Sequence, residues 1–326
     1  MYRACLLPLA LLSSIASASA AAPAVAQTVS GQPATALTPP VVPYVKPQPP
    51  GELVDIGGRS LHIDCKGSTE GPVVIFEAGL SQFTAHSGFG KAQELIAPFS
   101  KVCIYDRAGL GWSDPAPGAR TQQDMVEDLH RLIAAKGLEG PLVLVGHSMG
   151  GLLVRLYAKR YPSQVAAIVL LDATPESYNF APGAAEGRMS AIAQIDAALA
   201  GARDGVPVVA LPPETAADVM LAFTPEVLRS VKQEYEAIDL LSEDLRRPGG
   251  YGTLGDKPLA VIRRGLGSSP PSEQDERWRK AQEALTFLSA HSVMIVAEKA
   301  GHVIAYDQPE IVADTVRKIL GEIGER

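Results

Sequence analysis

The stretch from residue 146 to residue 151, Gly-His-Ser-Met-Gly-Gly, limits the possible folds of this chain more than any other. A short apolar run precedes it and is typical of a buried parallel strand, and the residues after it have helical spacing and a basic last turn. A chain that turns from strand into helix over one residue crowds the neighbours of that residue, so these neighbours must be very small. Gly146 and Gly150, two positions on either side of Ser148, meet this requirement. The stretch therefore predicts a sharp turn with the hydroxyl of Ser148 at its tip.

Strands and helices alternate along most of the chain. Apolar runs predict strands at residues 52–56, 60–65, 73–77, 101–105, 141–145, 165–171, 259–263 and 292–296. Amphipathic spacing predicts one helix from Thr121 to Ala135 and a last helix from about Pro309. This order favours an α/β protein with a mostly parallel sheet that helices flank on both faces. The segment 174–254 has helical stretches and no convincing strand, and we expect it to form a cap over the carboxyl edge of the sheet.

The first residues have the features of a secretory signal peptide. Arg3 precedes a short apolar run, and a small-residue cleavage site ends at Ala26. The apolar run is too short to span a bilayer, so we expect residues 1–26 to be removed and the protein to be secreted or periplasmic, without a stable membrane anchor. Residues 27–51 are rich in proline and predict an extended leader, whereas residues 52–326 fit one globular domain.

Composition and charge argue against several classes of protein. Hydrophobic residues form 46% of the chain and charged residues 20%, so disorder is not its main state. The net charge is −7 without any basic cluster, which argues against nucleic acid as a partner. No residues have the spacing of metal ligands, and no cofactor is expected. Cys65 and Cys103 lie in predicted strands, so we expect buried free thiols, with a disulfide as the alternative in an exported protein.

One of the six histidines fits the role of a base for Ser148. A serine hydroxyl is a weak nucleophile, so a neighbouring group must take its proton during attack. His302 lies in a loop a few residues after the last predicted strand. Functional groups of parallel sheets gather at the carboxyl ends of the strands, where Ser148 also lies. His147 is adjacent in sequence, but neighbouring side chains on a sharp turn point apart. We therefore predict His302 as the general base.

Four segments together resemble the α/β-hydrolase superfamily, and the resemblance extends over nearly all of the predicted domain. They are Glu77-Ala78-Gly79-Leu80, the loop 106–113 with the sequence Asp-Arg-Ala-Gly-Leu-Gly-Trp-Ser, the turn at 146–151, and Gly301-His302. The turn resembles the nucleophile elbow of that superfamily. The resemblance implies the α/β-hydrolase fold, with an eight-stranded sheet whose second strand is antiparallel, and a serine-dependent hydrolase.

The acid that would orient His302 is harder to place. Most members of the superfamily carry it after the seventh strand, but residues 264–271 contain no carboxylate. Asp172 lies directly at the carboxyl end of the sixth predicted strand, a position that some members use, and we favour it. Glu276 and Asp275 are the alternatives, although Asp275 also fits the pattern of a helix N-cap.

Two backbone N–H groups complete the expected site. That of Met149 follows the nucleophile at the start of a helix, and the resemblance implies the N–H of Leu80 as the second donor to an oxyanion. The expected activity is hydrolysis of small-molecule carboxylic esters through an acyl-enzyme on Ser148. A peptidase or a carbon–carbon bond hydrolase with the same triad, and a ligand-binding protein with weak turnover, remain the alternatives because one fold supports many activities.

Overall fold

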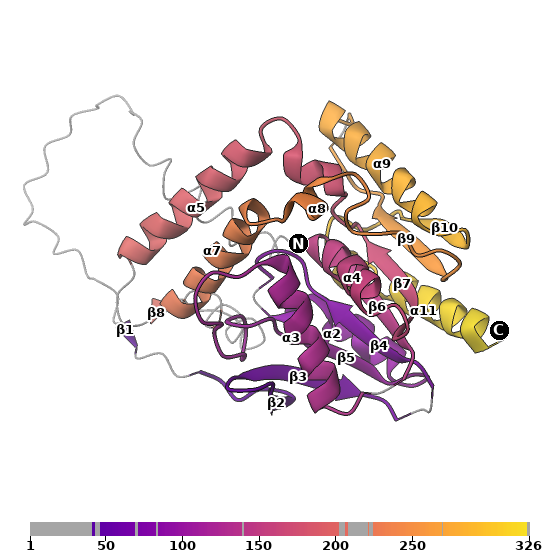
Figure 1. The fold of residues 1–326 in the computed structure, drawn as a ribbon, viewed down its shortest axis with the longest axis horizontal. Coiled ribbons are helices and arrows are strands. Elements are labelled where there is room, and N and C mark those ends of the chain that lie inside the picture. Colours follow the sequence, from indigo (N-terminus) through magenta and orange to yellow (C-terminus); the bar gives the residue numbers. More distant parts are fainter. Residues whose placement is uncertain are drawn as a thin grey trace, which may run out of the picture.

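The computed structural model describes residues 41–42, 46–68, 71–82, 84–138, 140–201, 206–207, 221, 224–268 and 270–324 (Figure 1). The predicted signal peptide at residues 1–26 lies outside this range, as does the predicted leader apart from residues 41–42 and 46–51. Within the described residues, no helix combines the length and the apolar character needed to cross a membrane.

An eight-stranded sheet forms the centre of the protein (Figure 1). Its strands lie in the order β10-β9-β7-β6-β4-β5-β3-β2. Strand β3 runs antiparallel to both of its neighbours, and every other neighbouring pair is parallel. The strands are β2 Glu52–Asp55, β3 Ser60–Lys66, β4 Val73–Glu77, β5 Val102–Tyr105, β6 Leu142–His147, β7 Val165–Leu171, β9 Leu259–Arg264 and β10 Ser292–Ala297. The predicted sheet and its antiparallel second strand are confirmed.

Helices cover both faces of the sheet because its central strands are apolar on both sides. Successive residues of a strand point to opposite faces, so Val74 and Phe76 of β4 pack in one core while Val73 and Ile75 pack in the other. Helices α2, α10 and α11 cover the first face, and α3 and α4 cover the second. The flanking helices are α2 Ala85–Ile96, α3 Gln122–Ala135, α4 Met149–Arg160, α9 Glu273–Leu285, α10 Ile304–Asp307 and α11 Pro309–Gly324, and η2 Thr286–Leu288 follows α9.

Local signals in the sequence determine where several helices begin and end. The side chain of Thr121 accepts a hydrogen bond from the backbone N–H of Asp124, and Asp124 accepts one from the N–H of Thr121, so a capping box starts α3 at the predicted position. Gly137 takes a φ of 64° just beyond the end of α3. Helix α2 was not predicted, because Gly88 and Gly90 weaken the helical pattern in the middle of that segment.

The segment between β7 and β9 is mainly helical. It contains η1 Glu176–Phe180, α5 Ala184–Gly201, α7 Pro225–Asp239 and α8 Glu243–Arg246. Helices α5 and α7 pack against each other through Ile195, Leu228 and Val231, and Figure 1 shows both beyond the layers that flank the sheet. One detail departs from the expected strand-free insert. Strand β8 (Val206–Pro207) pairs with β1 (Val41–Val42), and two residues are too few to produce a recognisable sequence pattern.

Cys65 of β3 and Cys103 of β5 form a disulfide. The expectation of two free thiols is therefore wrong. The antiparallel register of β3 and β5 places the two residues directly opposite each other, with 4.1 Å between their Cα atoms. This register depends on how distant segments pair, which composition and local pattern do not determine.

Candidate active site

Ser148 lies at a strained turn between β6 and α4. Its φ of 52° and ψ of −121° fall in a region that side chains other than glycine rarely adopt. A Cβ atom at Gly146 would lie 2.6 Å from the carbonyl oxygen of Gly150, and one at Gly150 would lie 2.3 Å from that of Glu77. Both positions therefore require glycine, and the predicted sharp strand–turn–helix unit is confirmed.

Asp172 and His302 meet at the carboxyl edge of the sheet. Asp172 directly follows β7, and His302 lies in the loop after β10. The Nδ1 atom of His302 is 2.7 Å from Oδ2 of Asp172. Asp172 is fully buried, whereas the side chain of His302 is 37% exposed. The structure thus brings the favoured acid next to the predicted base.

The alternative acids lie in other interactions. Glu276 forms an ion pair with Arg279 on the same helix. Asp275 accepts hydrogen bonds from Ser272 and caps the start of α9. Hydrogen bonds from Ser268 and from Ser272 also keep the pKa of Asp275 well below its usual range. Among the described residues, neither carboxylate contacts His302.

The carboxylate of Asp172 has further donors that the sequence did not predict. Arg264 donates to Oδ2 from its side chain over 2.7 Å and to Oδ1 from its backbone N–H over 3.3 Å. The indole N–H of Trp278 donates to Oδ1 over 2.8 Å. Burial alone would raise the pKa of Asp172, but His302, Arg264 and Trp278 outweigh burial and lower it. The carboxylate is therefore held in its ionised form, as a group that orients a histidine requires.

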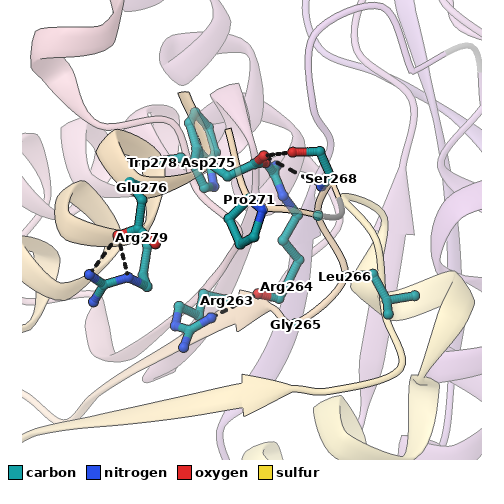
Figure 2. Close-up of a pocket in the computed structure, with 11 residues that line it drawn as sticks. Arg263, Arg264, Gly265, Leu266, Ser268, Pro271, Asp275, Glu276, Trp278 and Arg279 are labelled. Carbon is teal, nitrogen blue, oxygen red and sulfur yellow. Dashed lines mark hydrogen bonds and ion pairs between the residues drawn. The ribbon is translucent and has the colours of Figure 1, made fainter. Parts of the chain in front are cut away.

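A small cavity lies beside these two partners of Asp172. It has a volume of about 140 Å³, and Figure 2 shows Arg263, Arg264 and Trp278 among the residues that line it. Ser148 and His302 do not line this cavity. Arg264 stands at the end of β9, where most superfamily members carry the acid, so its position in the sequence was the one available signal for its contact with Asp172.

His147 holds the backbone of the His302 loop. Its Nε2 atom is 2.8 Å from the carbonyl oxygen of His302, and the centroids of the two rings are 4.7 Å apart. Burial and the neighbouring His302 ring lower the pKa of His147 to about 3. His147 is therefore neutral at ordinary pH, and its Nε2–H donates to the carbonyl. This contact was also not predicted, because it joins residues 155 positions apart.

The hydroxyl of Ser148 faces Thr174 in this structure. The distance between Ser148 Oγ and Thr174 Oγ1 is 3.4 Å. Among the described residues, Ser148 forms no hydrogen bond with His302. Hydrogen bonds between a nucleophile and its base are often long without substrate and shorten when substrate binds.

The residues predicted as oxyanion donors lie next to Ser148. A Cβ atom at Gly79 would be 3.1 Å from Cβ of Ser148, so the loop that carries Leu80 passes directly beside the serine. Met149 follows Ser148 as the first residue of α4. Within the described part of the chain, the backbone N–H groups of Leu80 and Met149 have no hydrogen-bond acceptor. Both groups are therefore available to bind an oxygen of a substrate.

Backbone strain is concentrated at this edge of the sheet. Among the described residues, the non-glycine residues with positive φ are Ser81 at 60°, Ser148 at 52° and Asp172 at 40°. Each such residue costs on the order of 1–3 kcal/mol and persists where the surrounding structure holds it. Strained positions of this kind cluster at functional sites, which supports this edge as the site of chemistry.

The loop that follows β5 shapes the neighbourhood of the site. Asp106 accepts hydrogen bonds from the backbone N–H groups of Ala85 and Trp112 and contacts Nδ1 of His62. A Cβ atom at Gly111 would lie 2.1 Å from Oδ2 of Asp106. Asp106 and Gly111 thus maintain a turn beside the site. Among the described residues, no cluster of His, Cys, Asp and Glu is arranged to hold a metal ion.

The fold and this edge of the sheet define a protein with the α/β-hydrolase fold. The family model for the alpha/beta hydrolase fold matches residues 72–216. Over these residues the chain is similar to the α/β-hydrolase superfamily, and the described residues have the fold of that superfamily.

Relatives in sequence include several proteins whose activity is not named. An uncharacterized protein of Schizosaccharomyces pombe is 36% identical over 78 residues, which cover 24% of this chain and 15% of that protein. The uncharacterized protein YqjL of Bacillus subtilis is 22% identical over 267 residues, which cover 79% of this chain and 87% of that protein. The 2-(acetamidomethylene)succinate hydrolase of Mesorhizobium japonicum is 30% identical over 47% of this chain and 56% of that enzyme.

Solved structures resemble the whole fold. A putative lipase from Acinetobacter baumannii has a TM-score of 0.62 and 17% identity, with 84% of this chain and 91% of that chain covered. An esterase from Thermogutta terrifontis has a TM-score of 0.56 and 22% identity, with 87% and 99% covered. At these identities the likeness establishes the fold alone.

Proposed function

We propose that this protein is an exported serine hydrolase that cleaves carboxylic esters through an acyl-enzyme on Ser148. The observation that carries the proposal is the 2.7 Å contact between His302 and the buried, ionised Asp172 at the same sheet edge as Ser148. A histidine held by a carboxylate is a general base whose tautomer and orientation are fixed. The lipase and the esterase with the same fold are consistent with this proposal.

In the first half of the reaction, Oγ of Ser148 attacks the ester carbonyl while Nε2 of His302 takes the hydroxyl proton. The carbonyl oxygen becomes an oxyanion, which accepts hydrogen bonds from the backbone N–H groups of Leu80 and Met149. The intermediate then collapses. The bond to the alcohol oxygen breaks, His302 returns its proton to that oxygen, and the acyl group stays on Ser148.

In the second half, a water molecule attacks the acyl carbon as His302 takes one of its protons. The same two N–H groups hold the second oxyanion. Collapse breaks the bond to Oγ, which regains its proton from His302, and the carboxylic acid leaves. Asp172 remains ionised throughout because Arg264 and Trp278 stabilise its charge, so it supports the positive ring of His302 without taking its proton.

The helical insert is proposed to act as a cap that limits access to this site. Helix α7 contributes Glu234, which contacts the loop of Leu80 directly through the N–H of Ser81. Insertions after the sixth strand of the sheet lie at the carboxyl edge, where substrates of such sheets bind. The cap residues would then select the acyl or alcohol group.

Export is proposed from the N-terminal pattern of residues 1–26 and is supported by the disulfide between Cys65 and Cys103. Disulfides persist mainly in oxidising compartments. The test is the location and the mass of the mature protein in a bacterial host that expresses the full chain. We expect a periplasmic or secreted protein that begins at Gln27, and a cytoplasmic protein of full mass would contradict export.

The activity is tested with p-nitrophenyl esters of increasing acyl length. We expect wild type to hydrolyse at least one of them and Ser148→Ala to lose at least about 10³-fold in kcat. Ser163→Ala is the matched control. Ser163 is exposed and lies just beyond the last residue of α4, a helix about 18 Å long, whereas Ser148 precedes the first residue of this helix. Cleavage of anilides or carbon–carbon bonds in place of esters would favour the other hydrolase classes, and binding without turnover would favour a ligand-binding protein.

A further inference from the structure

Arg107, in the loop after β5, is a buried side chain whose every N–H donor is used. Its Nη1 donates to Oε1 of Glu77 over 2.8 Å and to the carbonyl of Ala78 over 2.6 Å. Its Nη2 donates to the carbonyl of Gly79 over 2.6 Å and to Oε2 of Glu234 over 2.9 Å, and its Nε donates to Oε1 of Glu234 over 2.6 Å. An arginine has five N–H donors, so the guanidinium is completely paired.

The guanidinium of Arg107 remains protonated in this position. Its side chain is 1% exposed, and burial alone would lower its pKa. The carboxylates of Glu234 and Glu77 outweigh burial, so the pKa of Arg107 is raised above its usual range. A permanently charged, fully paired guanidinium fixes its acceptors more firmly than neutral donors would.

One acceptor of Arg107 belongs to the peptide that carries a proposed oxyanion donor. The carbonyl of Gly79 and the N–H of Leu80 are parts of one planar peptide group, and in a trans peptide they point in opposite directions. Because Arg107 holds the carbonyl of Gly79, the N–H of Leu80 must point away from the guanidinium. The cation also withdraws electrons from this carbonyl, which strengthens the N–H as a donor.

Glu234 connects this arrangement to the helical insert. It lies on α7, its side chain is fully buried, and it binds Arg107 through both carboxylate oxygens. It also accepts a hydrogen bond from the backbone N–H of Ser81 over 2.9 Å. Ser81 follows Leu80 and has the strained φ of 60°. The contacts of Glu234 therefore hold the loop of Leu80 both through Arg107 and directly at Ser81.

We propose that Glu234 is a positioning residue that makes the oxyanion donor at Leu80 depend on the placement of α7. This inference rests on the proposed ester hydrolysis. Movement of α7 changes the bidentate contact with Arg107, the orientation of the Gly79–Leu80 peptide and the strength of the oxyanion contact. The insert then controls the rate of the chemical step in addition to access.

The test uses Glu234→Gln, which keeps the size of the side chain but removes its charge and one acceptor oxygen. Either Nε of Arg107, or both Nη2 of Arg107 and the N–H of Ser81, then lose an acceptor. Lys232→Gln is the matched control, because Lys232 lies on the same helix and pairs with Asp196 of α5, away from the loop of Leu80. Circular dichroism identifies a temperature at which wild type and both variants are folded, and all kinetics are measured there.

Four quantities separate positioning from folding: kcat, KM, the rate of Ser148 labelling by a fluorophosphonate, and inhibition by a trifluoromethyl ketone that mimics the oxyanion. Complete loss of one oxyanion donor lowers kcat about 10²–10³-fold, so a displaced donor should cost about 10–100-fold. For Glu234→Gln we expect this loss in kcat and in labelling rate, an equal loss in ketone affinity and a KM within about twofold of wild type. Lys232→Gln should match wild type in all four quantities.

The outcomes distinguish this inference from the proposed function. If wild type labels at Ser148 and folded Glu234→Gln labels and turns over at the wild-type rate, the inference is wrong and the function stands. If wild type neither labels nor cleaves any ester, both are wrong. As a second measurement independent of the variant, the crystal structure of the wild-type phosphonate adduct should show the phosphoryl oxygen on the N–H of Leu80 with the carbonyl of Gly79 still on Arg107. A Leu80 N–H turned away from that oxygen would overturn the inference.

Discussion

The buried ring of His147 predicts a specific loss of stability as the pH falls. The pKa of His147 is lowered to about 3 in the folded protein, whereas an unfolded histidine has a pKa of about 6.5. Below pH 6.5 the unfolded chain therefore binds a proton that the folded protein does not bind. The free energy of unfolding decreases as the pH falls from about 6.5 towards 3, at about 1.4 kcal/mol for each pH unit. Between pH 7.5 and pH 4.5 the contribution of His147 amounts to about 3 kcal/mol.

The test is the substitution His147→Gln. Glutamine does not titrate, and its amide can still donate a hydrogen bond towards the carbonyl of His302. Urea unfolding at pH 7.5 and pH 4.5 gives the free energy of unfolding for wild type and variant. Other titrating groups are common to both proteins and cancel in the difference between them. We expect wild type to lose about 3 kcal/mol more than His147→Gln over this interval.

The control is His291→Gln, which removes an exposed histidine ring directly before β10. Its loss between the two pH values should follow that of wild type. Equal losses in wild type and His147→Gln would refute the reasoning, because they would show that the buried ring takes up its proton as readily as the unfolded chain does.

Three further predictions concern the site and the frame that holds it. Asp172→Asn should lower kcat by about 10⁴-fold, because asparagine cannot fix the tautomer and charge of the histidine. Asp275→Asn should keep kcat within about threefold of wild type in the same ester assay. A large loss in Asp275→Asn and a small one in Asp172→Asn would transfer the role of the acid to α9. Replacing Cys65 and Cys103 together by alanine should lower the free energy of unfolding by about 4 kcal/mol. This is the chain-entropy value for a disulfide between residues 38 positions apart. An unchanged urea midpoint would contradict a disulfide in the mature protein. Gly150→Ala should destabilise the fold by about 1–3 kcal/mol and reduce kcat. The new Cβ atom would lie 2.3 Å from the carbonyl oxygen of Glu77 and 2.6 Å from that of Ala78. Normal activity and stability would show that the turn can relax.

Local patterns in the sequence were sufficient to predict the eight strands of the main sheet and the edge of that sheet where the candidate site lies. Ser148 and Asp172 directly follow strands, Met149 starts a helix, and Leu80 and His302 lie in the loops after β4 and β10. Parallel strands end at one common edge. Strand boundaries therefore placed Ser148, Asp172 and His302 at one edge of the sheet, whereas the preference for Asp172 as the acid also rested on the resemblance to the α/β-hydrolase superfamily. The glycines around Ser148 were predictable because a strained turn excludes larger residues.

The unpredicted features depend on contacts between segments that are distant in sequence. Arg264 and Trp278 reach Asp172 from positions 92 and 106 residues away, and Glu234 reaches Arg107 across 127 residues. The sequence around each of these residues fits a solvated side chain equally well. Their contact partners are determined by how the strands and the helical insert pack against each other. The residues next to them in the sequence do not indicate this packing.

The proposed function depends above all on Ser148 as a nucleophile that His302 activates. The most direct test is labelling of the folded protein with a fluorophosphonate, followed by mass spectrometry of its peptides. We predict one labelled residue, Ser148, and a labelling rate that falls by at least about 10³-fold in His302→Ala, because the hydroxyl then lacks its base. Absence of label on Ser148 in folded wild type, or labelling that does not depend on His302, would contradict the proposed function.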